Sequence, residues 1–458
     1  MLKTIRHPWK LLNNPTVRGS LWTLGSYGLT SGLRFGSNLI LTRLLVPEFF
    51  GLMALASTLK IGLELLSDLG TQQSVIQSAQ GEDEEFRNTA WTVEAIRGIA
   101  LWLCCLLATV PMARFYDDPR LLILIPVVGL TTVFGGFASN STAILSRRLQ
   151  LGLYHVFDLL IYLFSLAVIL IASWVHPTVW ALAIGSVLGS FVEMIGSHFL
   201  IPGFRNRFCW NRDALDSMVS FGRGIFLATA LMFLADQADR LILGKILSLE
   251  VLGIYTIAFS IATLPRELLK TLSHRVLFPT ASRSAEQSRS ELRLKVRRQR
   301  WLILLPAAIV IALITCFGDF AVRALYDDRY LDAAWMLPTL SCGIWFSALF
   351  YTMSPNLLAI GKPIYLAHGN FARLFVVVFG LWGGYQVGGL LGAIIGISLS
   401  DCLAYAALYY GLFKERFMLV SQDIQSTLIY IALLAGMLFV RWGIGAGSPL
   451  DGILQSRL

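Results

Sequence analysis

Several basic side chains lie inside segments of the sequence that are otherwise strongly apolar. Arg34, Lys60, Arg97 and Arg373 are the candidates for chemistry among them. If these segments cross a bilayer, each ionisable group at mid-depth costs about 2.5 to 3.5 kcal/mol to insert, which makes it a candidate for function. An arginine fork matches phosphate oxygens and keeps its charge at physiological pH. We therefore predict that these four residues line a wet, cationic cavity that binds an anionic group.

Some of these charges have a possible partner on their own helix. Three pairs have spacings that place both side chains on one helix face: Lys60 with Glu64, Glu94 with Arg97, and Asp236 with Arg240. For these pairs, structural neutralisation is the simpler hypothesis. Arg34 and Arg373 have no acidic residue within one turn. The structural alternative to binding an anionic group is an ion pair from Arg34 to Asp236 or Glu64 on another helix.

A second set of ionisable residues could bind a coupling ion or pair with a neighbouring helix. Its members are Glu64, Asp236, Asp239, Arg240 and Asp401. The six cysteines show neither a CxxC motif nor a Cys/His ligand spacing, so we expect no metal site. The sequence contains no Walker A, HExxH or GxSxG motif. We predict no catalytic residue and no cofactor.

Long apolar segments must position these charges. The chain has 458 residues, of which 56% are hydrophobic and 14% charged, and its mean hydropathy is +0.67. About 20 apolar residues span a bilayer as a helix, so the composition predicts an all-α polytopic membrane protein. Thirteen candidate spans follow from hydropathy: 21–45, 49–70, 89–111, 121–143, 156–175, 178–201, 219–246, 251–270, 301–322, 333–358, 364–385, 388–412 and 427–444.

The distribution of Lys and Arg predicts the orientation of these spans. With the N-terminus inside, about 24 of the basic residues fall in inside segments and about 8 in outside segments. The net charge of +9 therefore indicates a membrane surface rather than nucleic acid. The basic stretch from Arg283 to Arg300 is predicted to form an inside amphipathic helix that faces anionic lipid head groups.

The sequence also contains an internal repeat. A shift of 202 residues aligns LILTRLLVPEFFGLMALA, from Leu39, with LILGKILSLEVLGIYTIA, from Leu241, and it places Asp236 at the position of Arg34. A Tyr-Asp-Asp string follows the third span of each half, at 116–118 and 326–328. Six spans return the chain to its starting side, so the two halves are expected to share one orientation about a pseudo-twofold axis along the membrane normal.

This repeat predicts five regions along the chain. They are a basic cytoplasmic N-terminus at 1–20, a six-helix lobe at 21–205, a cytoplasmic linker at 206–218, a second six-helix lobe at 219–415, and an additional transmembrane helix with a tail at 416–458. A substrate site is expected between the two lobes, as in transporters that rock two helix bundles about a central cavity.

Several strings resemble one family of membrane proteins. RLLVPEFFG at 43–51, Asp68-Leu69-Gly70, Gln77, FYDDP at 115–119 and Gly361-Lys362 resemble the pattern of the polysaccharide-export flippases, which belong to the multidrug/oligosaccharidyl-lipid/polysaccharide exporter superfamily. The likeness covers roughly residues 20 to 415. It implies two six-helix lobes with alternating access, and a cationic cavity that receives the pyrophosphate of a polyprenyl-linked oligosaccharide. Arg34 and Lys60 match the basic groups expected on the first and second spans.

The resemblance also implies a location and partners. It places the chain in the bacterial inner membrane, with the lipid-linked oligosaccharide and membrane lipids as ligands and a polysaccharide polymerase and glycosyltransferases as possible partners. Three alternatives remain at this stage: a cation-coupled multidrug antiporter of the same superfamily, an integral-membrane glycan polymerase or ligase, and a scaffold without transport. The antiporter would favour a carboxylate-dominated cavity, whereas the polymerase would need a large outside loop with catalytic Arg or His.

Overall fold

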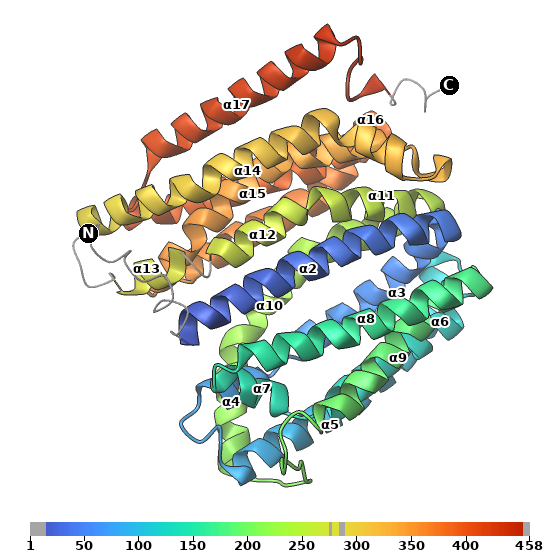
Figure 1. Cartoon of the computed structure of the whole chain (residues 1–458), viewed down its shortest axis with the longest axis vertical. Coiled ribbons are helices and arrows are strands. Elements are labelled where there is room, and N and C mark those ends of the chain that lie inside the picture. The colour runs from blue at the N-terminus through green and yellow to red at the C-terminus, as the bar shows by residue number, and fades with distance from the viewer. Residues whose placement is uncertain (1–14, 274–276, 284–288, 452–458) are drawn as a thin grey trace. The chain divides into compact units, whose positions relative to one another are not determined.

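The computed structural model describes residues 15–273, 277–283 and 289–451 (Figure 1). Over this part of the chain the structure is helical and contains no strand, which confirms the all-α prediction. The helices are α2 (Pro15–Leu44), α3 (Pro47–Leu66), α4 (Thr71–Gln77), α5 (Glu84–Tyr116), α6 (Leu121–Phe137), α7 (Ser141–Arg147), α8 (Leu151–Val175), α9 (Val179–Ser197), α10 (Arg212–Ile246), α11 (Leu249–Ala262), α12 (Leu264–Leu272), α13 (Phe278–Arg283), α14 (Arg289–Leu325), the 3₁₀ turn η2 (Asp328–Tyr330), α15 (Ala333–Ala359), α16 (Ile364–Lys414) and α17 (Val420–Gly443).

Each predicted span coincides with one or more of these helices. Nine helices within the described ranges are long and apolar enough to cross a membrane, or ten if α6 and α7, bent by 56°, form one span. Helices α2 and α10 fall outside this set. Helix α16 has 51 residues and holds two predicted spans joined at a break at Gly388 and Gly389. The chain is a multi-pass membrane protein, and the count of thirteen remains a prediction.

The chain divides into two compact units. We call residues 1–45 with 52–230 the first unit, and residues 46–51 with 231–458 the second unit. The division falls inside α10, whereas the predicted linker at 206–218 is non-helical up to 211 and then enters that helix. The basic N-terminus is predicted at 1–20, and its residues 1–14 lie outside the described part of the chain. The two six-helix lobes remain a prediction.

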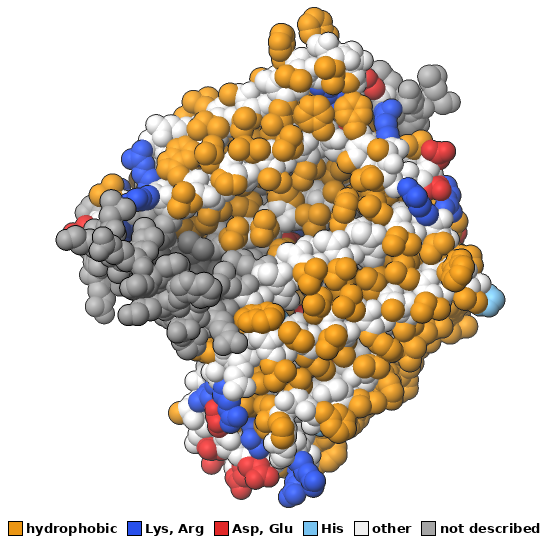
Figure 2. Space-filling view, viewed as in Figure 1, with side chains coloured by type: hydrophobic (Ala, Val, Ile, Leu, Met, Phe, Trp, Pro, Cys, Tyr) orange, Lys and Arg blue, Asp and Glu red, His pale blue; other side chains and the backbone are white. Residues whose placement is uncertain are grey.

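In the first unit, α5 packs closely on α6, and α8 packs on both α9 and α2. Glycine permits the α5–α6 approach, since a Cβ added at Gly98 or Gly136 would collide with the backbone of the opposite helix. Figure 2 shows hydrophobic side chains covering the visible sides of these helices, with Lys, Arg, Asp and Glu gathered near the helix ends. An apolar belt with charged ends is the surface expected of helices in a bilayer.

In the second unit, α15 packs against α11, α14 and α16, and α17 lies along α14 (Figure 1). The core of this unit is built around buried residues of α15, including Trp345, which stacks on Tyr430 of α17 with ring centroids 4.7 Å apart. The last predicted span is therefore a packed element of the second unit and not a loose appendage.

Two buried ion pairs join α17 to α14. Arg300 of α14 reaches Asp423 of α17 at 2.5 Å. Near the other end of the helices, Arg441 of α17 forms two bonds with Asp319 of α14, at 2.5 and 2.7 Å. The two pairs have opposite polarity, because the arginine comes from α14 in one pair and from α17 in the other. The pairs join the start of α14 to the start of α17 and the end of α14 to the end of α17, so the two helices run parallel.

The basic stretch at 283–300 differs from its prediction as a separate amphipathic helix. Residues 284–288 lie outside the described ranges, and from Arg289 the chain already belongs to α14. Leu292 and Val296 are buried while Arg297 and Arg298 are exposed, so the amphipathic pattern itself is present. Arg300, at the end of this stretch, is fully buried because it pairs with Asp423.

The repeated Tyr-Asp-Asp strings form similar local turns. In the first, Arg120 bonds Asp118 at 2.6 Å, and in the second, Arg329 bonds Asp327 at 2.7 Å. Burial raises the pKa of the Asp118 carboxyl, but the hydrogen bonds and charge of Arg120 lower it by more, so the net shift is downward. Both strings therefore end a long helix with a turn that an aspartate and an arginine hold together.

The repeated glycines lie beside each other in the second unit. A Cβ added at Gly51 would collide with the carbonyl oxygen of Leu249, and one added at Gly253 would collide with that of Pro47. Only glycine permits this approach of two helix starts, which explains why the repeat carries glycine at both positions.

Candidate functional site

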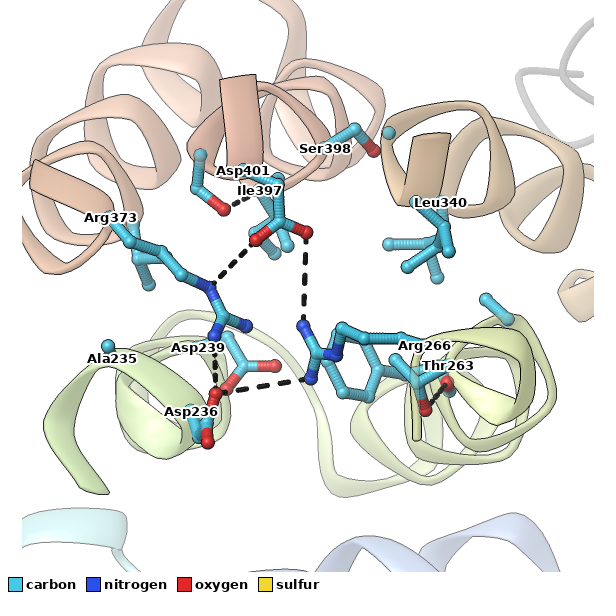
Figure 3. Close-up of a pocket in the computed structure, with 16 residues that line it drawn as sticks. Ala235, Asp236, Asp239, Thr263, Arg266, Leu340, Arg373, Ile397, Ser398 and Asp401 are labelled. Carbon is cyan, nitrogen blue, oxygen red and sulfur yellow. Dashed lines mark hydrogen bonds and ion pairs between the residues drawn. The ribbon is translucent and has the colours of Figure 1, made fainter. Parts of the chain in front are cut away.

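Five charged residues line one hollow in the second unit. We call them the five-charge cluster: Asp236 and Asp239 of α10, Arg266 of α12, and Arg373 and Asp401 of α16. Figure 3 shows their side chains converging from these helices. The hollow has a volume of about 20 Å³, which is room for about one water molecule or small ion.

Four members of the cluster form a closed ring of alternating charge. Arg373 Nη1 lies 2.5 Å from Asp236 Oδ1, and Arg373 Nε lies 3.1 Å from Asp401 Oδ1 (Figure 3). Arg266 lies 4.0 Å from Asp236 and 3.9 Å from Asp401. Arg266, Arg373 and Asp401 are buried. The ring neutralises Arg373, so this arginine has no guanidinium charge left uncompensated for a ligand.

Asp239 differs from the other two acids of the cluster. It is 3% exposed, and its Oδ2 accepts a hydrogen bond of 2.5 Å from the Tyr255 hydroxyl. Its Oδ1 is buried and has no hydrogen-bond partner among the described residues. Three carboxylates then face two guanidinium groups in one hollow, which leaves one acidic group in excess.

The predicted pair of Asp236 with Arg240 is wrong. Asp236 pairs with Arg373 of α16, a residue on a facing helix, instead of with Arg240 on its own helix. Spacing along the sequence cannot show which charges on other helices lie nearby. Arg240 instead hydrogen-bonds the side chain of Gln237 and lies over the ring of Phe259, 5.0 Å from its centroid. Arg266 is also a member of the cluster, although it was not among the predicted site residues. The repeat could have indicated Arg266, because the 202-residue shift aligns it with Glu64, which is one of the predicted ionisable residues.

The two predicted same-helix pairs of the first unit are confirmed. Lys60 Nζ lies 3.5 Å from Glu64 Oε1, and Arg97 Nη2 lies 2.7 Å from Glu94 Oε2. Arg97 Nη1 also donates to the Glu64 carbonyl and to the Ser67 hydroxyl, both at 3.2 Å. Lys60 and Arg97 are therefore each held by a carboxylate.

A polar cavity of about 310 Å³ lies beside these pairs, and we call it the first-unit cavity. Its charged lining residues are Glu64, Asp68, Glu94 and Arg97. Acidic groups outnumber basic ones in this lining, so the first-unit cavity differs in charge from the cationic cavity predicted between the two lobes. Glu64 retains Lys60 as its basic partner.

Arg34 has a different environment from the other predicted basic residues. Its side chain is exposed on α2, and within the described part of the first unit it forms no ion pair. Its backbone carbonyl accepts a hydrogen bond from the Ser37 hydroxyl at 2.9 Å. Of the four predicted basic residues, Arg34 is the one whose charge the described residues of its unit leave uncompensated.

The helical fold, its apolar spans and the buried charges define a multi-pass protein of the membrane-transporter type. The model of the family described as "Polysaccharide biosynthesis protein" matches residues 40–335, and this chain belongs to that family. Among curated relatives, it is 21% identical to the succinoglycan biosynthesis transport protein ExoT of Rhizobium meliloti, over 87% of this chain and 80% of the relative. It is 20% identical to the lipopolysaccharide biosynthesis protein WzxC of Escherichia coli, over 88% of this chain and 82% of the relative.

Solved structures share the fold. The lipid II flippase MurJ, in an inward closed conformation, aligns with a TM-score of 0.69 at 14% identity, covering 93% of this chain and 92% of that chain. An inward-facing multidrug resistance MATE transporter aligns with a TM-score of 0.59 at 16% identity, covering 91% and 95%. These similarities show that this chain shares the polytopic helical fold of those structures.

Proposed function

We propose that this protein is a flippase that moves a polyprenyl-pyrophosphate-linked oligosaccharide across the inner membrane for polysaccharide biosynthesis. Family membership and the transport and biosynthesis names of its relatives support this assignment. Unaided transfer would expose the pyrophosphate charges and sugar hydroxyls to hydrocarbon, at a cost of several kcal/mol for each unpaired group. Helices that carry polar groups inside an apolar exterior remove this cost.

The exposed, unpaired side chain of Arg34 supports the assignment of the head-group contact within the described part of its unit. An exposed arginine without an acidic partner in its unit remains available to bind phosphate oxygens through two parallel hydrogen bonds. Lys60, Arg97 and Arg373 were predicted to share this role, and their carboxylate partners make them weaker candidates. We assign the head-group contact to Arg34.

Deleting the gene and identifying the accumulated intermediate tests this function. A lipid-linked oligosaccharide should accumulate on the inner leaflet, and proteoliposomes that contain the purified protein should move that glycolipid between leaflets. Accumulation of an unpolymerised glycan on the outer side would instead indicate a polymerase.

The same proposal includes a location and partners. The Lys and Arg distribution supports a cytoplasmic N-terminus, and the repeat supports two halves with a parallel orientation. Cysteines placed at Glu48 and Glu250 should then be labelled from the same, outer side of the membrane. A polymerase and glycosyltransferases would make and use the glycan that the protein carries.

We further propose that Asp239 binds the coupling cation, a proton or a small metal ion, while Asp236 and Asp401 serve structural pairing. Asp239 has the spare buried carboxylate oxygen of the cluster, whereas Asp236 and Asp401 are engaged by arginines. A drug antiporter, the second candidate function, would use a carboxylate of this kind. An amphiphilic cation that displaces the glycolipid in transport assays would favour that function.

The effects of Asp239→Asn and Asp236→Asn are expected to differ. Asp239→Asn keeps the Tyr255 hydrogen bond and removes only the excess acid, so the protein should fold and lose the dependence of its transport rate on an imposed ion gradient. Asp236→Asn leaves Arg373 without its closest partner and should lower the unfolding temperature by several degrees. Thermal unfolding and gradient-driven proteoliposome assays measure both effects. Gradient dependence that survives in Asp239→Asn would contradict the coupling role.

A further inference from the structure

We propose that the first-unit cavity binds a neutral hexose of the transported glycan, as a sugar-recognition subsite separate from the phosphate contact at Arg34. This inference rests on the proposed flippase function. The cavity volume of about 310 Å³ is at the small end of the range for ligand pockets, which suits one or two sugar rings and not a whole oligosaccharide.

The lining supplies hydrogen-bonding groups that suit sugar hydroxyls. Carboxylates of Glu64 and Asp68 and side-chain amides of Gln72 and Gln73 line the cavity. A hydroxyl both donates and accepts, so it pairs with carboxylate oxygens and with amides. Gln72 and Gln73 are exposed, and their side chains have no hydrogen-bond partner within the described ranges. These amides can therefore bind a ligand without breaking a bond inside the protein.

The charge of the lining excludes an acidic ligand. Glu64, Asp68 and Glu94 provide three carboxylates. Lys60 pairs with Glu64 and Arg97 pairs with Glu94, so Asp68 is the acid in excess. Arg97 already donates to Glu94, to the Glu64 carbonyl and to Ser67, so little of its donor capacity remains for a ligand. Repulsion from the excess acid disfavours a pyrophosphate or a uronic acid at this position, whereas a neutral hexose escapes this penalty.

The backbone of this cavity also explains a family string. In Asp68-Leu69-Gly70, the Asp68 carboxylate accepts a hydrogen bond of 2.8 Å from the Gly70 amide, and Gly70 has a left-handed φ of 64°. This turn directs the chain from α3 into α4, which places Gln72 and Gln73 on the cavity wall beside Asp68. The string therefore builds one wall of the proposed subsite.

A substitution at Gly135 can fill the cavity without disturbing helix packing. Gly98 and Gly136 are required for the close packing of α5 on α6, but a Cβ added at Gly135 meets no atom within 4 Å. Gly135 nevertheless lines the cavity. A leucine at this position should fill cavity space without disturbing helix packing. Gly383 of α16 is the matched control, because it is also a helical glycine with no atom within 4 Å of an added Cβ and does not line the cavity.

Saturation-transfer NMR on the full-length protein in nanodiscs tests the proposal with glucose, galactose, glucuronate and inorganic pyrophosphate as probes. At least one of the two hexoses should give a signal that Gly135→Leu reduces at least tenfold and Gly383→Leu leaves unchanged. Glucuronate should give no signal sensitive to Gly135→Leu. No hexose signal, a hexose signal unaffected by Gly135→Leu, or a glucuronate or pyrophosphate signal lost in that variant would each overturn the proposal.

A transport assay separates this proposal from the flippase function. Gly135→Leu should lower the glycolipid translocation rate at least tenfold in proteoliposomes while the unfolding temperature stays at that of the unmodified protein. If the unmodified protein transports the glycolipid and Gly135→Leu transports it equally fast, the subsite is wrong and the flippase function stands. If the unmodified protein does not transport it, the flippase function itself fails, and the hexose-binding result still decides the subsite.

Discussion

Arg34→Ala is expected to lower the rate of lipid-linked oligosaccharide translocation about 100-fold while the protein still inserts and folds. Loss of a charged partner from a desolvated contact costs about 2 to 5 kcal/mol, and tenfold in rate corresponds to about 1.4 kcal/mol. Arg34 is exposed and makes no ion pair in the described part of its unit, so its removal should leave the fold intact. The measurement is the initial rate of glycolipid transfer in proteoliposomes.

Two further variants test whether the effect requires the bidentate guanidinium group of Arg34. Arg34→Lys keeps the charge but loses the bidentate geometry, so it should restore only part of the rate. Arg114→Ala removes an exposed arginine from the last turn of α5 and should change the rate by less than about twofold. Transfer by Arg34→Ala at the original rate would contradict a head-group role for this residue.

Arg441→Ala is expected to destabilise the protein by about 3 to 5 kcal/mol, the largest effect on stability among these predictions. Arg441 is 2% exposed and forms two bonds with Asp319, so its removal leaves a buried carboxylate without its cation. The same side chain also bonds the Cys316 carbonyl at 2.5 Å. Thermal unfolding in detergent, together with protease sensitivity of α17, measures the loss.

The double variant Arg441→Met with Asp319→Leu is the matched control. Replacing both charges by apolar groups of similar volume removes the unpaired charge, so stability should return to within about 1 kcal/mol of the original protein. Equal stability of Arg441→Ala and the unmodified protein would show that α17 does not depend on this pair. The equivalent pair, Arg300 with Asp423, should behave in the same way because Arg300 is fully buried.

Local spacing predicted only part of the charge pairing. Residues three or four apart on a helix must lie on one face, so Lys60 with Glu64 and Glu94 with Arg97 followed from sequence. Asp236 has the same spacing from Arg240, yet it pairs with Arg373, which is 137 residues away along the chain. Spacing shows which pairs are possible, but the nearest charge on a facing helix decides which pair forms.

The sequence by itself determined that this chain is a polytopic helical membrane protein, because apolar segments long enough to span a bilayer leave few other structures. Its short strings indicated the family by resemblance, and the match of the family model over residues 40–335 confirms it. It also located the buried charges along those segments. Only the tertiary structure decided which charges neutralise one another: Arg266, Arg373, Asp236 and Asp401 close a ring, and Arg441 binds α17 to α14. Electrostatic energy depends on distances through space, and contacts between helices far apart in the chain are set by packing, which periodicity does not encode.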